Sequence, residues 1–139
     1  MKSFAALLAI LALGTVVVTS AVAASPRHAA INIRHEFKGC HAWSIDNRPF
    51  AAHVNANLAT GGSITFTNHD VMPHQLIKTS GPSATFTGSR LMSHMAATVK
   101  VTFRHAGTYR FTTKGGEDYS TGVKTSGEDN VLTLTVTVR

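Results

Sequence analysis

The sequence predicts an all-β sandwich of about seven or eight short strands. Apolar residues recur at every second position in short segments that are rich in β-branched and aromatic residues. Glycine, asparagine and proline separate these segments, and an apolar repeat of helical period is almost absent. Strands that each bury one face are typical of two antiparallel sheets packed against each other, here with Greek-key connections.

Four strands are expected in the first half of this domain. They cover residues 31–37, 52–58, 63–68 and 74–79. In the first two, apolar or aromatic residues alternate with polar ones, and His35 falls on the apolar side. The pair Gly61-Gly62 makes a turn, after which Ile64 and Phe66 share one face of the third strand.

The second half contributes further strands. They are expected over residues 85–87, 98–103, 108–113 and 132–138. Val99, Val101 and Phe103 point inward, and Gly107 turns the chain into the following strand. The strand at 132–138 is the clearest, because its apolar residues alternate with threonines, which suit the solvent side of a sheet.

The first residues have the pattern of a secretory signal peptide. Lys2 precedes an uncharged apolar run over residues 4–18, and Ala21-Val22-Ala23 gives a small-residue cleavage pattern, with Ala24 as a near alternative. We expect residues 1–24 to be removed and residues 25–139 to form the domain, in the periplasm or secreted. The run is shorter than the ~20 residues that a spanning helix needs, so no membrane span is expected after cleavage.

Charge and cysteine content limit the function further. The formal net charge is +6, but the basic residues are scattered, and an exported protein is not expected to bind nucleic acid. The single cysteine, Cys40, has no partner for an internal disulfide. Outside the cell, such a thiol is expected to be buried, paired between chains or bound to a metal.

Soft metal-binding side chains gather at one end of the predicted sandwich. We infer this position by assuming that the chain reverses its direction at each turn between successive strands. The candidate ligands at this end are Cys40, His41, His74, Met92, His94 and Met95. Thiolate, imidazole and thioether groups favour copper, and copper(I) in particular, whereas zinc rarely uses methionine.

Two stretches resemble the cupredoxin family. Residues 61–74, Gly-Gly-Ser-Ile-Thr-Phe-Thr-Asn-His-Asp-Val-Met-Pro-His, are similar to the strand that ends in Asn-x-Asp and is followed by Pro-His. Residues 103–111, Phe-Arg-His-Ala-Gly-Thr-Tyr-Arg-Phe, are similar to the aromatic hairpin with Gly-Thr-Tyr at its turn. The resemblance spans about residues 31–139 and implies that His74 binds copper.

The chain departs from the family after that hairpin. Cupredoxins usually carry Cys, His and often Met on the last long loop, whereas no cysteine, histidine or methionine follows His105 here. Three readings stay open. The site is lost, it is rebuilt from Cys40, His41 and the segment 92–95, or oxygen ligands such as Glu117 or Asp118 take part. The rebuilt site is favoured, because the missing ligand types reappear at the same predicted end.

We therefore expect a copper protein with a non-standard site for one ion, Cu(I) or Cu(II). Cys40, His74 and His94 are the favoured ligands, with Met92 or Met95 as a weak fourth. The expected role is electron transfer or copper handling with a redox or copper-transfer protein as partner. No nucleophile–base pair is recognisable, so an enzyme is not expected. The alternative is a metal-free sandwich that acts as a binding or structural module.

Overall fold

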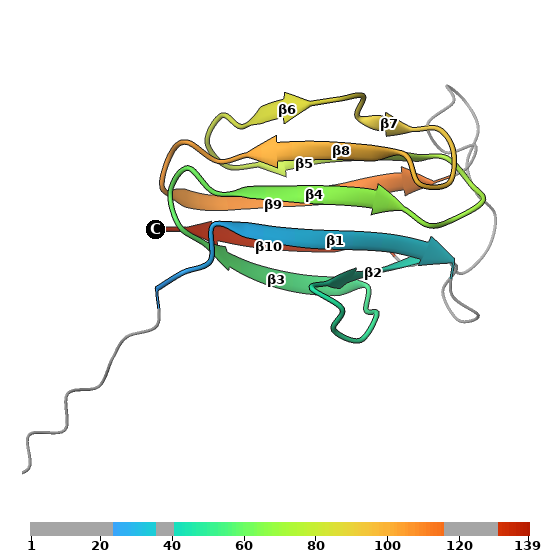
Figure 1. Cartoon of the computed structure of the whole chain (residues 1–139), viewed down its shortest axis with the longest axis horizontal. Coiled ribbons are helices and arrows are strands. Elements are labelled where there is room, and N and C mark those ends of the chain that lie inside the picture. Colours follow the sequence, from blue (N-terminus) through green and yellow to red (C-terminus); the bar gives the residue numbers. More distant parts are fainter. Residues whose placement is uncertain (1–23, 36–40, 116–130) are drawn as a thin grey trace, which may run out of the picture.

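Ten strands form two five-stranded sheets in the computed structural model, which describes residues 24–35, 41–115 and 131–139. The first sheet has the order β2-β1-β4-β8-β6 and the second β3-β10-β9-β5-β7 (Figure 1). The strands are β1 (His28–His35), β2 (His41–Ile45), β3 (His53–Leu58), β4 (Ser63–Asn68), β5 (His74–Ser80), β6 (Thr85–Thr87), β7 (Leu91–Met92), β8 (Thr98–Thr102), β9 (Gly107–Gly115) and β10 (Thr133–Val138). The predicted all-β sandwich is confirmed, with more strands than the seven or eight expected.

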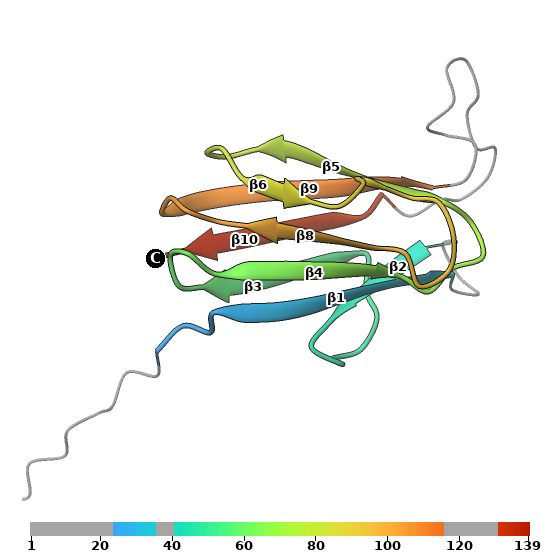
Figure 2. The same ribbon diagram turned by 45° about the horizontal axis from the view of Figure 1, so that its top comes forward.

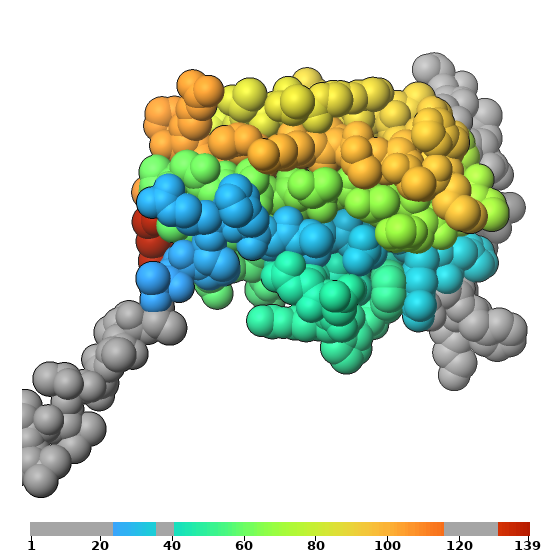
Figure 3. All heavy atoms as spheres, in the orientation of Figure 1, coloured from blue at the N-terminus to red at the C-terminus, as the bar shows by residue number. Residues whose placement is uncertain are grey.

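The core lies between the two sheets, which form two layers in Figure 2. The alternating residues that predicted the strands supply it, for example Ile31 and Ile33 on β1 and Leu134 and Val136 on β10. Aromatic rings fill its centre, where Phe103 and Tyr109 meet edge to face with ring centroids 4.8 Å apart. Figure 3 shows the outer face of the first sheet, in which neighbouring strands appear as adjacent bands.

The sequence pattern did not predict two elements, the two-residue strand β7 and the longer strand β2. β2 pairs antiparallel with β1, and its five residues are all buried. The segment after it returns along the outer edge of β2, where Ala51 forms an isolated antiparallel bridge with Trp43. Because both faces of β2 are covered, its residues do not alternate between apolar and polar, which is the signal that the prediction used.

The strand directions bring one set of strand ends together. β1 pairs parallel with β4, and β3 pairs parallel with β10, so each sheet is mixed, and the prediction of two antiparallel sheets was wrong in this respect. β1, β4 and β9 run toward the right end of the molecule in Figure 1, where β2 and β5 begin. We call this the metal-centre end. β2 and β3 both run away from this end. The unexpected strand β2 therefore does not reverse the strands that follow it, and their predicted directions are unchanged.

None of the described segments forms a helix that is long and apolar enough to cross a membrane. The predicted signal peptide at residues 1–24 lies outside the described residues except for Ala24, and its cleavage stays a prediction.

Candidate metal centre

Two buried histidines meet across the sandwich at the metal-centre end. His41 begins β2 and pairs in register with His35 of β1, so it shares the inner face of the first sheet with Ile33 and Ile31. His74 begins β5 in the second sheet and pairs with Gly115 at the end of β9. The two imidazole rings stand at 90° with centroids 4.7 Å apart.

Asp70 joins these two histidines through a single oxygen. Its Oδ2 lies 3.1 Å from His41 Nδ1 and 3.1 Å from His74 Nε2. The other oxygen, Oδ1, accepts a hydrogen bond from the backbone N–H of Met72 at 3.1 Å. All three side chains are buried, so each of these polar contacts is shielded from water.

Asn68 fixes the loop that carries Asp70. Its Oδ1 accepts from the backbone N–H of Asp70 at 2.8 Å, an Asx turn that follows directly from the sequence Asn-x-Asp. Its Nδ2 donates to the carbonyls of Met72 at 2.8 Å and Met92 at 3.1 Å, with a longer contact of 3.4 Å to the carbonyl of His94. One buried amide therefore connects the loop before β5 to the segment after β7.

The electrostatics of the cluster assign a charge to the carboxylate. Burial acts to raise the pKa of Asp70, but the hydrogen bonds from Met72, His74 and His41 and the charge interaction with His74 outweigh it, so this pKa lies below its usual range. Burial is the main cause that lowers the pKa of His74, assisted by His41 and His35 and opposed by Asp70. At neutral pH the centre therefore holds an ionised Asp70 beside a neutral His74.

Ionised Asp70 can only accept hydrogen bonds, which settles the tautomers of both rings. His41 donates through Nδ1–H and His74 donates through Nε2–H. The nitrogens left without a proton are His41 Nε2 and His74 Nδ1, and the latter is buried with no hydrogen-bond partner among the described residues. A buried nitrogen that lacks a partner is costly unless a further group binds it.

Gly115 leaves room beside both rings. A Cβ at this position would lie 2.8 Å from His41 Nε2 and 3.1 Å from His74 Cε1. His41 Nε2, the nitrogen without a proton, therefore faces Gly115, and Cε1 of His74 faces it as well. A side chain at position 115 would push into this region. The orphaned nitrogen and the open space fit the binding of a metal ion by imidazole ligands.

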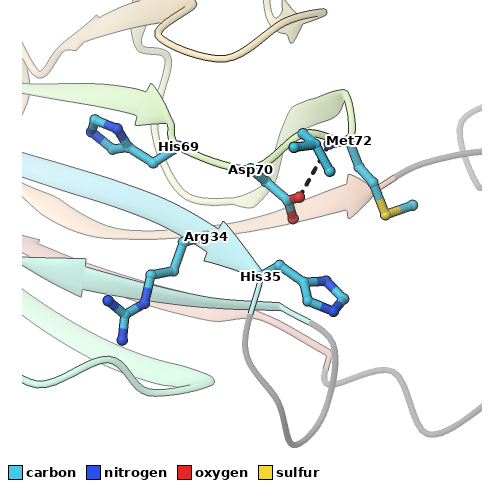
Figure 4. Close-up of a pocket in the computed structure, with 6 residues that line it drawn as sticks. Arg34, His35, His69, Asp70 and Met72 are labelled. Carbon is cyan, nitrogen blue, oxygen red and sulfur yellow. Dashed lines mark hydrogen bonds between the residues drawn. The ribbon is translucent and has the colours of Figure 1, made fainter.

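His35 adds a more exposed donor to the centre. One ligand atom each from His35, His41 and Asp70 lies within 4.8 Å of the others, so this His/Asp cluster could hold a metal ion. The rings of His35 and His41 meet edge to face, with centroids 5.9 Å apart. In Figure 4, His35, Asp70 and Met72 lie toward the end of the strands, whereas Arg34 and His69 extend away from them. These residues line a surface pocket beside the centre.

The structure brings together two of the six ligands predicted from the sequence, His41 and His74. Met92 pairs in register with His74 and is part of the buried hydrophobic core. His94 and Met95 lie at the same end but are exposed, and His94 does not belong to the His/Asp cluster. Cys40 precedes His41 in the sequence and lies outside the described residues. Its role as a ligand, like that of the other five, stays a prediction.

Sequence reasoning missed Asp70 and His35 as members of the centre. Asp70 stands in the Asn-x-Asp motif that supported the family resemblance, where only His74 received a role. His35 follows Ile31 and Ile33 at a period of two, so its position on the inner face was visible in the pattern. The hairpin register that sets it opposite His41 could not be known without β2.

A scan against models of protein families finds no match for this chain, and a search of curated proteins finds none either. Similar solved structures include a mutant of amicyanin in its Cu(I) form, with 16% identity, coverage of 79% of this chain and 82% of that one, and a TM-score of 0.44. A purple cupredoxin from Nitrosopumilus maritimus has 16% identity, coverage of 78% and 98%, and a TM-score of 0.44. A cysteine protease inhibitor from Entamoeba histolytica has 10% identity, coverage of 82% and 99%, and a TM-score of 0.44.

TM-scores below 0.5 at these identities say nothing about function. The fold is argued from the sheets themselves, which place two five-stranded layers face to face, with one parallel pair in each. The Asn-x-Asp loop and the Gly-Thr-Tyr hairpin occupy the turns of this sandwich at opposite ends. The chain therefore has the cupredoxin-like fold that its sequence resemblance implied.

Proposed function

We propose that this protein binds one copper ion at the centre formed by His41, His74 and Asp70, with His35 beside it. The observation that carries the proposal is the pair of imidazoles that share Asp70 Oδ2. Each ring uses one nitrogen for the carboxylate and keeps the other for a ligand. Metal-binding histidines commonly donate their second ring nitrogen to a carboxylate, which fixes the ring and its tautomer.

Asp70 acts in this proposal as a positioning residue for His41 and His74. Its low pKa keeps it an acceptor, so both imidazoles stay oriented before any ion arrives. The neutral state of His74 serves the same purpose, because only an unprotonated nitrogen binds a metal. The protein thus carries a preorganised donor pair in a buried position.

Copper is proposed over other metals because of the donor types. Imidazole nitrogen suits Cu(II), and Cys40, next to His41 in the sequence, would add the soft sulfur that copper also accepts. Copper bound here would supply one-electron chemistry or a transferable ion. The proposed role is accordingly binding, for electron transfer or copper handling, and not catalysis.

A protein partner fits the surface around the centre. Among the described residues, the large hydrophobic side chains that stand out as exposed are Val71, Met95 and Val131. Val71 and Met95 belong to loops at the metal-centre end, and Val131 lies just before β10 begins there. Exposed apolar residues at the end of the molecule that carries a redox or transfer site favour contact with another protein. We further propose export of the protein, on the basis of the apolar run and cleavage pattern in residues 2–24.

Metal content and spectra of the purified protein test this proposal. We expect about one Cu(II) per chain after loading with Cu(II), and nitrogen hyperfine structure from imidazole in its electron paramagnetic resonance spectrum. His74→Ala should remove that signal, whereas His105→Ala, an exposed histidine at the opposite end, should keep it. Protein that binds copper in neither oxidation state would contradict the proposal and favour the metal-free module.

Two further measurements separate the roles of the site. An intense visible band that disappears in Cys40→Ser would assign a thiolate ligand to Cu(II). Reversible cyclic voltammetry of the loaded protein would support electron transfer. Tight Cu(I) binding without a reversible wave would support copper handling.

A further inference from the structure

Three soft or imidazole side chains lie at the metal-centre end outside the buried cluster. They are Met72, His94 and Met95. Met72 is half-buried beside the surface pocket, and His94 is exposed. Met95 has 53% of its surface exposed, so it does not serve to fill space in the core as methionines commonly do.

His94 is held in the tautomer that suits a metal ligand. Its Nδ1 lies 2.9 Å from the carbonyl oxygen of Met95, and a carbonyl can only accept a hydrogen bond. Nδ1 therefore carries the proton, and Nε2 keeps an open lone pair on an exposed ring. Histidines that bind metals commonly donate their other ring N–H to a backbone carbonyl, which fixes the orientation of the ring.

The turn that carries Met95 is fixed from two sides. The N–H of Ala97 donates to the carbonyl of His94 at 3.0 Å, which closes a turn with Met95 at its tip. Ala96 has a φ of 66°, a left-handed conformation that costs energy for a residue other than glycine. Asn68 holds this conformation, because its carbonyl accepts from the N–H of Ala96 at 2.7 Å and its N–H donates to the carbonyl of Ala97 at 3.0 Å.

Asn68 also brings Met72 next to this turn. Its Nδ2 contacts the carbonyls of both Met72, at 2.8 Å, and His94, at 3.4 Å. The backbones of these two residues are therefore close together, although 22 positions separate them in the sequence. In Figure 4 the sulfur of Met72 lies at the far end of an extended side chain, away from the carboxylate of Asp70.

We propose that Met72, His94 and Met95 form a second, solvent-facing site for a soft monovalent ion, Cu(I), separate from the buried histidine–carboxylate centre. Two thioethers and one imidazole select Cu(I), whereas two imidazoles beside a carboxylate suit a divalent ion. The exposed site lies where an ion arrives from solvent or from another protein. It does not depend on whether the buried centre is occupied.

A titration with Ag(I), a soft ion that undergoes no redox change here, tests the second site. The protein would carry Cys40→Ser, so that the thiol does not compete, and 13C-labelled methionine methyl groups. We expect the methyl signals of Met95 and Met72 to shift and saturate at one Ag(I) per chain, while the signal of buried Met92 stays in place. Met95→Leu and His94→Ala should each weaken Ag(I) binding on the order of tenfold or more.

His105→Ala is the matched control and should leave the Ag(I) affinity unchanged, because His105 is exposed at the opposite end. Met95→Leu keeps the size of an exposed side chain, so folding is not at risk. Ag(I) that leaves the Met95 signal unmoved, or an affinity unaltered in Met95→Leu, would overturn the second site. Loss of Cu(II) binding alone, with the Ag(I) shifts intact, would overturn the proposal for the buried centre and leave this one standing.

Discussion

His41 and His74 come from opposite sheets and direct one ring nitrogen each to the same oxygen of Asp70. Their rings stand at a right angle, 4.7 Å apart. Because the Met72 N–H anchors the carboxylate and Asn68 anchors the backbone of Asp70, neither imidazole can rotate without breaking a buried hydrogen bond. This relationship makes the centre rigid and leads to specific expectations for variants.

Replacing Asp70 with asparagine should disorganise the centre while keeping its size. The two carboxylate oxygens together accept from three N–H groups, whereas an amide replaces one of these oxygens with a donor, so its NH2 must face either the Met72 N–H or both imidazole N–H groups. We expect the Cu(II) affinity in a competition titration to fall about 10- to 100-fold. The metal-free protein should lose about 1–3 kcal/mol of stability in urea, because a buried N–H loses its acceptor. Asp46→Asn, at an exposed turn, is the control, and an unaltered affinity in Asp70→Asn would contradict the positioning role.

Gly115→Ala tests the space beside the two rings. The added Cβ would stand 2.8 Å from His41 Nε2, closer than such atoms normally approach, so the imidazole has to move. We expect weaker Cu(II) binding and altered ring signals of His41 and His74 in NMR spectra. The neighbouring Lys114→Ala changes an exposed side chain on the same strand and should do neither. Wild-type affinity in Gly115→Ala would show that copper binds elsewhere.

Acid should destabilise the metal-free protein in two steps. Burial keeps the pKa of His74 below its ordinary 6.5, so as the pH falls below 6.5 the unfolded chain takes up a proton that the folded chain resists. The pKa of Asp70 is also lowered, from 3.8, so its contribution is present above that value and is lost as the pH falls through the folded-state pKa. Urea midpoints measured from about pH 8 to pH 3 should therefore fall in both windows. A midpoint that rises between pH 6.5 and 5 would contradict the assignment for His74, and His74→Ala should lack the first step.

Asn68→Ala should be among the most destabilising polar substitutions in the chain. The side chain is buried and connects Asp70, Met72 and Met92 through its hydrogen bonds. Its removal leaves several buried polar groups without partners, so we expect a loss of about 2–4 kcal/mol in urea unfolding. Asn32→Ala is matched to it, since Asn32 makes one exposed contact with His69 and should cost less than about 0.5 kcal/mol. Equal losses in the two variants would contradict the connecting role of Asn68.

Most of the fold was predictable because its strands bury one face each. The alternation at Ile31 and Ile33, or at Leu134 and Val136, leaves a period of two in the sequence. β2 was not predictable in this way, because Trp43 and its neighbours are covered on both sides. The two residues of β7 are too few to show any period.

The centre was predictable only in part. The assumption that the chain reverses at each turn correctly placed His41 and His74 at one end. That assumption requires only the positions of the turns, which the sequence indicates, and no side-chain geometry. The role of Asp70 depends on a loop that Asn68 folds through hydrogen bonds, which no periodic pattern encodes. Met92 lies in the core, whereas Met95 lies at the tip of a turn. This turn depends on the left-handed conformation of Ala96, which the sequence pattern does not show.

Strand β10 contributes no ligand, yet the second sheet cannot close without it. It lies between β3 and β9, and it pairs with β3 along its whole length and with β9 from Leu134 to Val138. β5, which presents His74, is attached to the far side of β9. A chain cut before Thr133–Val138 would retain His41, Asp70 and His74, but β3 would be separated from β9, β5 and β7, and the core would lose Leu134, Val136 and Val138. The complete sandwich can therefore form only after this last strand has been synthesised.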